Sequence, residues 1–144
     1  SKAPSDTILV CQPNDNKVAL MGELSAEYLQ MKGVLGYIVD GGCRDLEFIN
    51  QIRFPVWSKF FTPRDIVGYW KPTEIGEPIK IGDVIIKNGD YLIADIDGIV
   101  IIPKTHITEI LTESEKLINT ESIIRQEIRG GMDPQKAYLK YQAF

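Results

Sequence analysis

Residues 34–52 have the sequence VLGYIVDGGCRDLEFINQI, in which the spacing of apolar residues changes from that of a strand to that of a helix. The continuous apolar run Val34–Val39 predicts a buried strand. Asp40-Gly41-Gly42 is expected to break that strand, because paired glycines are typical of loops. From Arg44 to Ile52 the apolar residues recur at helical spacing. This stretch therefore predicts a strand, a glycine-rich loop and a helix.

The same alternation of strand and helix extends to both sides. Thr7–Cys11 predicts a second strand, Ala19–Lys32 a second helix, and Pro55–Phe61 a third strand. The order strand-helix-strand-helix-strand with short connections predicts a parallel sheet with right-handed crossovers. The fold class is therefore α/β, and the carboxyl ends of the strands are the expected place for a site.

Past Pro63 the pattern changes to short strands between glycine turns, which predicts antiparallel or mixed pairing. The expected strands are 66–70, 78–81, 84–86, 91–94 and 99–102. His106–Ile128 predicts a long helix. Asp133 is expected to cap a last helix, with Pro134 at its first position.

The composition excludes several classes of protein. The chain has 144 residues, 44% hydrophobic and 25% charged, as expected of one globular domain. Its net charge of −4 argues against a nucleic-acid partner. Two isolated cysteines give neither a disulfide framework nor a zinc spacing, which favours a reducing cytoplasm. No apolar run reaches the length of a membrane span, so no membrane partner is expected.

The candidate site is Val39–Asp45, where a strand gives way to a helix. Its glycines allow the backbone to approach a ligand. Asp45 offers oxygen to a hard cation, and the planar fork of Arg44 suits a carboxylate. The alternative is a salt-bridged turn in which Asp45 caps the following helix.

Five segments in order resemble one family, the RraA-like/4-hydroxy-4-methyl-2-oxoglutarate (HMG/CHA) aldolase family. They are Met21–Leu24, similar to its acidic loop; Val39–Asp45, similar to its V-D-G-x-x-R-D signature; Phe54–Val56, similar to its F-P-V strand; residues 88–103, similar to its P-G-D…D-x-D-G-V-x-x-x-P segment; and residues 140–144, similar to its K-Y-G-x-F ending.

The resemblance implies one RraA-like domain over residues 1–144, truncated at the N-terminus relative to the family. Ser1 in place of an initiator Met is expected of a truncated or processed product. The implied fold is a layered α/β/α domain of the swivelling β/β/α type, with a mixed, largely parallel central sheet and C-terminal helices. The resemblance also implies a homo-oligomer, a trimer or a hexamer.

The family's aldolases have an acid, twenty intervening residues and then Arg-Asp, and Glu23 stands at that spacing before Arg44. By the resemblance, Asp45 ligates Mg²⁺ or Mn²⁺, Glu23 holds water on that metal, and Arg44 faces the substrate oxygen and the developing enolate. The substrate-binding residues that it implies are Gly22, Leu24, Ser25 and Arg44, with backbone amides at a helix start receiving the substrate carboxylate.

The implied function is that of a divalent-metal-dependent aldolase or decarboxylase, which cleaves a pyruvate-yielding oxo acid through a metal-stabilised enolate. Its substrates would be of the 4-hydroxy-4-methyl-2-oxoglutarate type, or oxaloacetate. One departure is that Phe48 stands where the family's aldolases have a further acid, and Glu47 lies one place earlier. The alternative is a non-catalytic RraA-like regulator that binds a ribonuclease or another protein.

Other polar residues have two interpretations each. Asp95 and Asp97 are candidates for metal ligands or for a turn between two strands. Glu121 is a candidate for a neighbouring subunit's metal site or for a solvated helix face. His106 is expected at a helix start without a catalytic role.

Overall fold

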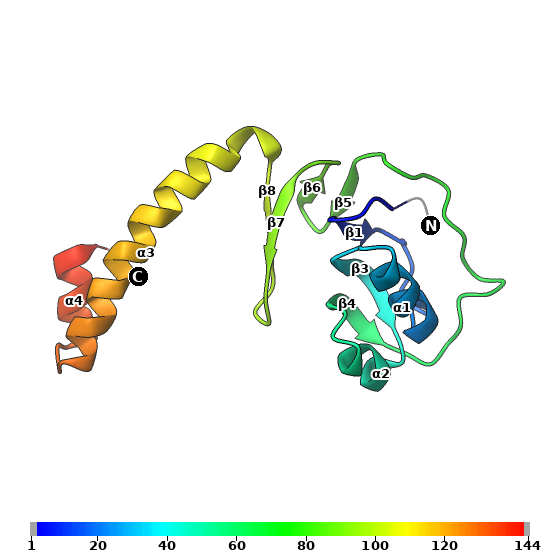
Figure 1. Cartoon of the computed structure of the whole chain (residues 1–144), viewed down its shortest axis with the longest axis horizontal. Coiled ribbons are helices and arrows are strands. Elements are labelled where there is room, and N and C mark those ends of the chain that lie inside the picture. The colour runs from blue at the N-terminus through cyan, green and yellow to red at the C-terminus, as the bar shows by residue number, and fades with distance from the viewer. Residues whose placement is uncertain (1–2, 143–144) are drawn as a thin grey trace. The chain divides into compact units, whose positions relative to one another are not determined.

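The computed structural model describes residues 3–142, which form two compact units that divide between Asn88 and Gly89 (Figure 1). The first unit contains the candidate site. Each unit is described by itself below, and the single domain over residues 1–144 stays a prediction.

The sheet of the first unit is parallel throughout. Its strands are β1 (Ile8–Cys11), β2 (Ala19–Met21), β3 (Gly36–Cys43) and β4 (Val56–Phe61). β1 pairs with the first half of β3 and β2 with its last residues, so these two strands follow one another along the same edge of β3. β4 pairs along the other edge. The predicted parallel sheet is confirmed.

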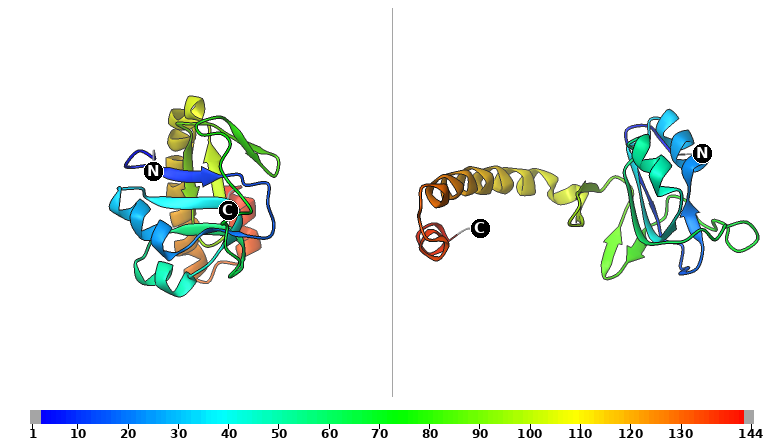
Figure 2. Two further views of the ribbon diagram at one scale, coloured as in Figure 1. Left: turned by 90° about the vertical axis from the view of Figure 1, so that its right-hand side faces the viewer. Right: turned by 90° about the horizontal axis from the view of Figure 1, so that it is seen from below.

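Two helices, α1 (Glu23–Met31) and α2 (Leu46–Gln51), cover one face of this sheet (Figure 2). They share a face because the chain advances across the sheet in one direction and each crossover is right-handed. The Gln30 side chain donates a hydrogen bond to the Ile52 carbonyl at 2.9 Å and so links the two helices. The buried core between helices and sheet consists of Met21, Ala26, Leu29, Val34, Tyr37, Val39, Cys43, Ile49 and Phe54.

Three expectations for the first unit are wrong. Ala19–Met21 forms a strand rather than the start of the helix, because β3 provides a parallel partner there. Asp40-Gly41-Gly42 does not break β3: the pairing register with β4 shifts between Val39 and Gly42, so the strand absorbs the glycines as a bulge. Residues 66–70 form a turn, in which the Trp70 backbone N–H donates to the Ile66 carbonyl at 3.2 Å.

The remaining elements match the predicted pattern. The first unit ends with an antiparallel hairpin of β5 (Ile79–Ile81) and β6 (Val84–Ile86). The second unit has the antiparallel hairpin β7 (Tyr91–Ala94) and β8 (Ile99–Ile102), a 3₁₀ turn η1 (Lys104–His106) and the helices α3 (Ile107–Arg129) and α4 (Pro134–Tyr141). The predicted α/β class, with a largely parallel sheet and C-terminal helices, is confirmed.

The two C-terminal helices pack through a small interface in the second unit. Ile124 of α3 and Ala137 of α4 are buried, and the Lys140 ammonium pairs with Glu127 at 2.9 Å. Asp133 caps α4 as predicted, because its carboxylate accepts the Lys136 N–H at 3.1 Å. Of the predicted K-Y-G-x-F ending, residues 143 and 144 lie outside the described residues. Within residues 3–142, no helix combines the length and apolarity needed to cross a membrane.

Candidate active site

Three strand ends meet at the carboxyl edge of the first unit's sheet. The Arg44 N–H donates to the Met21 carbonyl at 2.9 Å, which ties the end of β3 to the end of β2. The Thr62 N–H donates to the Cys43 carbonyl at 3.1 Å, which ties in the end of β4. Beside these ends lies an open cleft of about 720 Å³, lined by Ala19, Leu20, Met21, Gly22, Glu23, Leu24, Ser25, Cys43, Arg44, Asp45, Leu46, Phe61, Thr62, Pro63 and Ile66.

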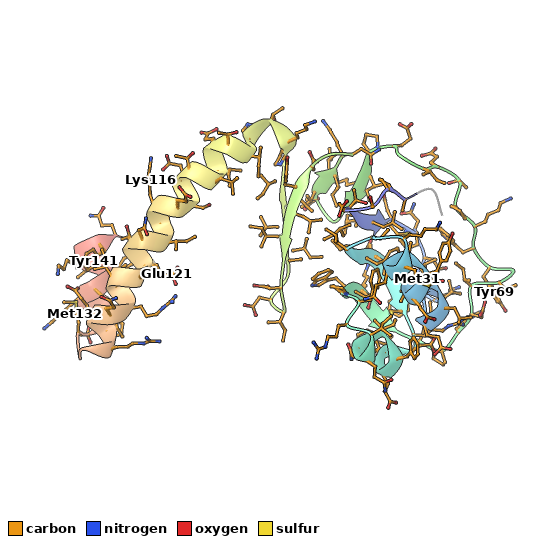
Figure 3. All side chains as sticks on the ribbon, viewed as in Figure 1. Met31, Tyr69, Lys116, Glu121, Met132 and Tyr141 are labelled. Atoms are coloured by element: carbon orange, nitrogen blue, oxygen red, sulfur yellow. The ribbon has the colours of Figure 1, made fainter. Side chains whose placement is uncertain are left out.

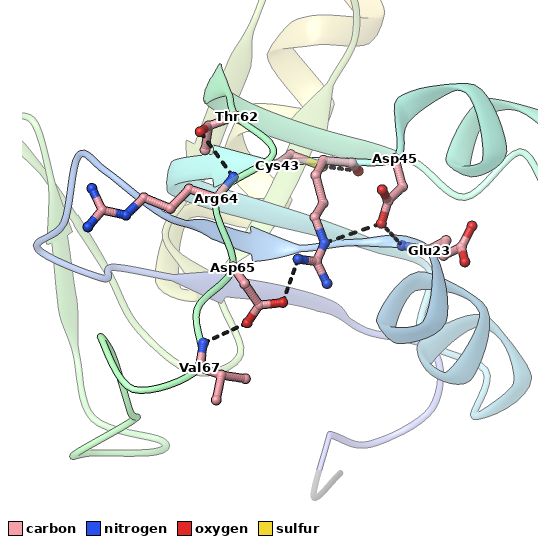
Figure 4. Close-up of polar contacts among 8 residues, drawn as sticks. Glu23, Cys43, Asp45, Thr62, Arg64, Asp65 and Val67 are labelled. Carbon is pink, nitrogen blue, oxygen red and sulfur yellow. Dashed lines mark hydrogen bonds and ion pairs between the residues drawn. The ribbon is translucent and has the colours of Figure 1, made fainter.

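Asp45 follows the end of β3, and its side chain turns to the start of α1. Its backbone is left-handed, with φ 59° and ψ 37°, a conformation that Asp tolerates better than most residues. Its Oδ2 accepts the backbone N–H of Glu23 at 3.0 Å (Figure 4). The N-cap residue of α1 is Gly22, which has no side chain to cap the helix, so Asp45 supplies the acceptor from 22 residues away. The alternative that Asp45 caps the following helix is wrong, since its side chain makes no cap bond to α2.

Arg44 lies between two carboxylates. Its Nε is 3.3 Å from Asp45 Oδ2, and its Nη1 donates to Asp65 Oδ2 at 2.6 Å. The hydrogen bond to Asp65 is the main cause that raises the pKa of the guanidinium above its ordinary value, and Asp45 adds to it. No residue among 3–142 accepts a hydrogen bond from Nη2. This nitrogen is therefore available to a ligand.

Asp65 is the member of this group that the sequence interpretation missed. Its Oδ1 accepts the Val67 N–H at 2.6 Å, while its Oδ2 accepts Arg44 (Figure 4). These two hydrogen bonds hold the pKa of the carboxyl below its ordinary value, the backbone bond being the larger cause. The available signal was its position, because Asp65 follows the predicted strand Pro55–Phe61 just as Arg44 and Asp45 follow the predicted strand Val34–Val39.

Two glycines allow this close packing. A Cβ on Gly22 would lie 2.7 Å from Asp45 Oδ2 and 2.8 Å from Arg44 Nε. A Cβ on Gly42 would lie 2.5 Å from the Val18 carbonyl oxygen, a distance that real Cβ atoms do not reach. The first glycine makes room for the charged pair, and the second lets β3 approach the chain that enters β2.

All six residues predicted for the site line the same cleft, namely Gly22, Glu23, Leu24, Ser25, Arg44 and Asp45. The Leu24 and Ser25 N–H groups lie in the first turn of α1, and no described acceptor bonds them. The carboxylate of Glu23 makes no hydrogen bond or ion pair within residues 3–142, so only its backbone is tied to Asp45. Glu47 and Phe48 are not among the residues that line the cleft.

The donor set of the cleft fits a hard cation that keeps much of its water. The described residues contain no cluster of three or more His, Cys, Asp or Glu suited to a metal. Mg²⁺, however, is often held by one or two carboxylates together with water and substrate. Asp45 Oδ1 has no protein partner among the described residues, and Oδ2 of the same carboxylate is hydrogen-bonded to the backbone N–H of Glu23 at the start of α1. Three carboxylates against one guanidinium also leave the site with excess negative charge, which favours a divalent cation.

Cys43 lines the cleft but is unsuited to nucleophilic catalysis. Burial is the main cause that raises its pKa to about 11, so almost none of the thiol is ionised at neutral pH. Its Sγ–H donates to the Arg44 carbonyl at 3.4 Å. The thiol therefore acts as a small buried group beneath Arg44.

The other polar residues with two interpretations have local contacts or positions within the second unit. Asp95 accepts the N–H groups of Asp97 and Gly98 at 2.8 and 3.2 Å, which makes it a turn residue of the β7–β8 hairpin. Glu121 projects from α3 and forms an ion pair with Arg125 (Figure 3). His106 lies where η1 passes into α3, as predicted.

The chain is similar to several known proteins, three of which follow. An uncharacterized protein of Methanocaldococcus jannaschii is 33% identical over 120 residues, which cover 81% of this chain and 56% of that protein. The 4-hydroxy-4-methyl-2-oxoglutarate aldolase of Thermus thermophilus is 30% identical over 88 residues, 61% of this chain and 53% of that protein. Among solved structures, Streptomyces coelicolor RraAS2, described as an unusual member of the RNase ES inhibitor RraA protein family, has a TM-score of 0.81 at 26% identity over 88% of this chain and 65% of that one.

The chain thus spans about half the length of the curated relatives it matches. The model of the RraA-like family, described as Aldolase/RraA, matches residues 1–101, more than half of the 144 residues. The chain therefore belongs to the RraA-like family.

Proposed function

We propose that the chain carries the site of a divalent-metal-dependent aldolase or decarboxylase, which releases pyruvate from a small oxo acid. The substrates proposed are 4-hydroxy-4-methyl-2-oxoglutarate and oxaloacetate. The observation that carries this proposal is the joint presentation of Arg44 and Asp45 at a strand end, against the first turn of α1. The aldolase name of the Thermus thermophilus relative supports the same reaction class.

The first turn of α1 provides for the substrate's carboxylate. The Leu24 and Ser25 N–H groups are unpaired within the described chain and line the cleft. A helix N-terminus also carries a partial positive charge, which favours an anion. Because Asp45 already occupies the Glu23 N–H, the substrate is directed to the next two amides.

The metal proposed is Mg²⁺ or Mn²⁺, held by Asp45 with Glu23 as an outer carboxylate. All-oxygen donors and the absence of His or other Cys ligands beside Asp45 in the described cleft favour such hard cations over zinc. When bound, a divalent cation supplies a Lewis acid that draws electron density from the 2-oxo acid.

Arg44 supplies positive charge to the reacting oxygen. When the C–C bond of a 4-hydroxy-2-oxo acid breaks, the 4-hydroxyl loses its proton to water and becomes the carbonyl of the leaving fragment. The bonding electrons pass to the pyruvate fragment as an enolate, which then takes a proton from water, and a fixed donor lowers the barrier to that charge. The Arg44 guanidinium is held on both sides and keeps Nη2 for this oxygen. Loss of CO₂ from oxaloacetate leaves the same enolate, so both reactions use the same group.

A coupled pyruvate assay on the 144-residue chain tests the proposal. We expect pyruvate release from oxaloacetate or from 4-hydroxy-4-methyl-2-oxoglutarate that stops with EDTA and returns with Mg²⁺ or Mn²⁺. Arg44→Ala and Asp45→Ala should abolish it. Asp83→Ala removes the carboxylate of an exposed ion pair with Lys80 and should leave it unchanged. Full activity in either site variant would rule out the assigned roles.

A second candidate is a regulator that binds a ribonuclease or another protein. The likeness to Streptomyces coelicolor RraAS2, described as a member of an RNase ES inhibitor family, is the observation that favours it. It predicts no metal-dependent turnover of either oxo acid. It also predicts measurable binding of a purified RNase E-type ribonuclease, which the enzyme proposal does not require.

The proposal extends to assembly as a homotrimer or hexamer, which the family resemblance implies. Light scattering with size-exclusion chromatography measures the mass of the assembly, and a monomer at assay concentration would contradict this part alone.

A further inference from the structure

We infer that Asp65 is a positioning residue, which fixes the orientation of the Arg44 guanidinium so that Nη2 is the nitrogen left for the substrate. The inference rests on the proposed function and adds a residue to it. Asp65 lies beyond the end of β4, whereas Arg44 and Asp45 follow β3.

The Asp65 carboxylate is itself held in place. Its two oxygens have separate partners: Oδ1 accepts the Val67 N–H at 2.6 Å, and Oδ2 accepts Arg44 Nη1 at 2.6 Å. The hydrogen bond from the Val67 N–H closes a short turn of the chain after β4. It holds the Asp65 carboxylate in place independently of Arg44. A flexible surface acid would lack this second anchor.

Two contacts from different sides define the plane of the guanidinium. Nε faces Asp45 Oδ2 at 3.3 Å and Nη1 faces Asp65 Oδ2 at 2.6 Å. The guanidinium is planar and rigid, so fixing two of its nitrogens also fixes the third. The Arg44 side chain is only 35% exposed. Of its two ion pairs, the one with Asp45 is longer than the one with Asp65. Without Asp65, the guanidinium group of Arg44 would be free to rotate about the bonds of its side chain.

The ion pair has a consequence for charge as well as for geometry. Asp65 is a carboxylate at neutral pH, since the ordinary aspartate pKa of 3.8 already lies far below 7 and its two hydrogen bonds lower the pKa further. The substrate carboxylate is assigned to the Leu24 and Ser25 amides, which Asp65 does not contact. We therefore expect Asp65 to act mainly on kcat, through the orientation of a donor that is needed when charge develops.

The variants Asp65→Asn and Asp65→Ala separate positioning from local folding. Asn keeps an oxygen that can accept the Val67 N–H, but its neutral amide is a poor partner for the guanidinium, whereas Ala removes both contacts. We expect kcat for oxaloacetate to fall about tenfold in both variants, with KM changed by less than about twofold. Asp83→Ala is the control for loss of an exposed ion-pair carboxylate.

A second readout does not depend on activity. Nitrogen-15 NMR of the metal-free chain reports rotation of the Arg44 guanidinium, with its signals identified by their loss in Arg44→Lys. We expect separate, slowly exchanging Nη signals in the wild type and averaged signals in Asp65→Asn. Unchanged Arg44 signals in Asp65→Asn would overturn the inference.

The two proposals fail in different ways. If the wild type turns over but Asp65→Asn and Asp65→Ala have wild-type kcat, the positioning role is overturned and the proposed function stands. If the wild type shows no metal-dependent turnover, the proposed function fails, and the NMR comparison alone decides whether Asp65 orders Arg44.

Discussion

The carboxylate of Asp45 accepts the backbone N–H of Glu23 at 3.0 Å, across 22 positions of sequence. Through this bond the residue proposed to hold the metal also caps the helix proposed to bind the substrate carboxylate. One oxygen of Asp45 is thereby committed to structure and to Arg44, while Oδ1 is left for a cation. Stability and activity can therefore be separated at this residue.

Asp45→Asn and Asp45→Ala should differ in stability but not in activity. Asn keeps an oxygen for the Glu23 N–H and tolerates the left-handed backbone, whereas Ala loses the cap at a cost of about 1 kcal/mol. Neither variant has the charged oxygen for a cation, so both should lose metal-dependent turnover. Urea unfolding and the pyruvate assay measure the two effects. Equal destabilisation by Asn and Ala would contradict the capping role.

Gly22→Ala should disturb the site through its side chain rather than its backbone. The backbone at Gly22 is extended, a conformation open to Ala, but the added Cβ would lie 2.7 Å from Asp45 Oδ2. Displacing Asp45 and Arg44 should lower kcat about 10- to 100-fold. The accompanying loss of stability should shrink when Gly22→Ala is made in the Asp45→Ala background, because the clash with Asp45 is then absent. Simple additivity in that double variant would count against the mechanism.

Acid should remove the contribution of Asp65 to stability. Its pKa is lowered in the folded chain, so the stabilisation is present above the ordinary aspartate value of 3.8 and is lost as the pH falls through the lower folded value. At pH 7 Asp65→Asn should unfold at a lower urea concentration than the wild type. That difference should shrink steadily below pH 4. A difference that stays the same from pH 7 to pH 2.5 would show that the ion pair contributes nothing.

Cys43 should resist alkylation in the native chain. A thiol with a pKa of about 11, instead of 9.0, has roughly 100-fold less thiolate at pH 8, and its side chain is fully buried. Mass spectrometry after iodoacetamide treatment, with and without urea, measures the rate at each cysteine. Cys11 is less buried and should react before Cys43 in the native chain. Equal rates for Cys43 in native and unfolded samples would contradict its burial.

The sequence alone predicted most of the fold that positions the site. Apolar periodicity predicted the parallel sheet, α1, α2 and the C-terminal helices, and glycine turns predicted the later hairpins. The Asp133 cap was also predictable, since it joins residues three positions apart. Two errors fell on the strand at Ala19–Met21 and the bulge at Asp40–Gly42, where pairing with β3 or β4 overrides the local pattern. A third fell on residues 66–70, which form a turn rather than a strand.

Within the site, the sequence by itself indicated Arg44 and Asp45 as a pair at a strand end, because residue type and position carry that information, and the resemblance to the family added Glu23 as the upstream acid. Only the tertiary structure decided that Asp45 caps α1 rather than α2 and that Asp65 joins Arg44. The physical reason is the separation of the residues along the sequence. Periodicity and local hydrogen bonds link residues a few positions apart. Contacts across 20 or more residues depend on which strands pair and in what register.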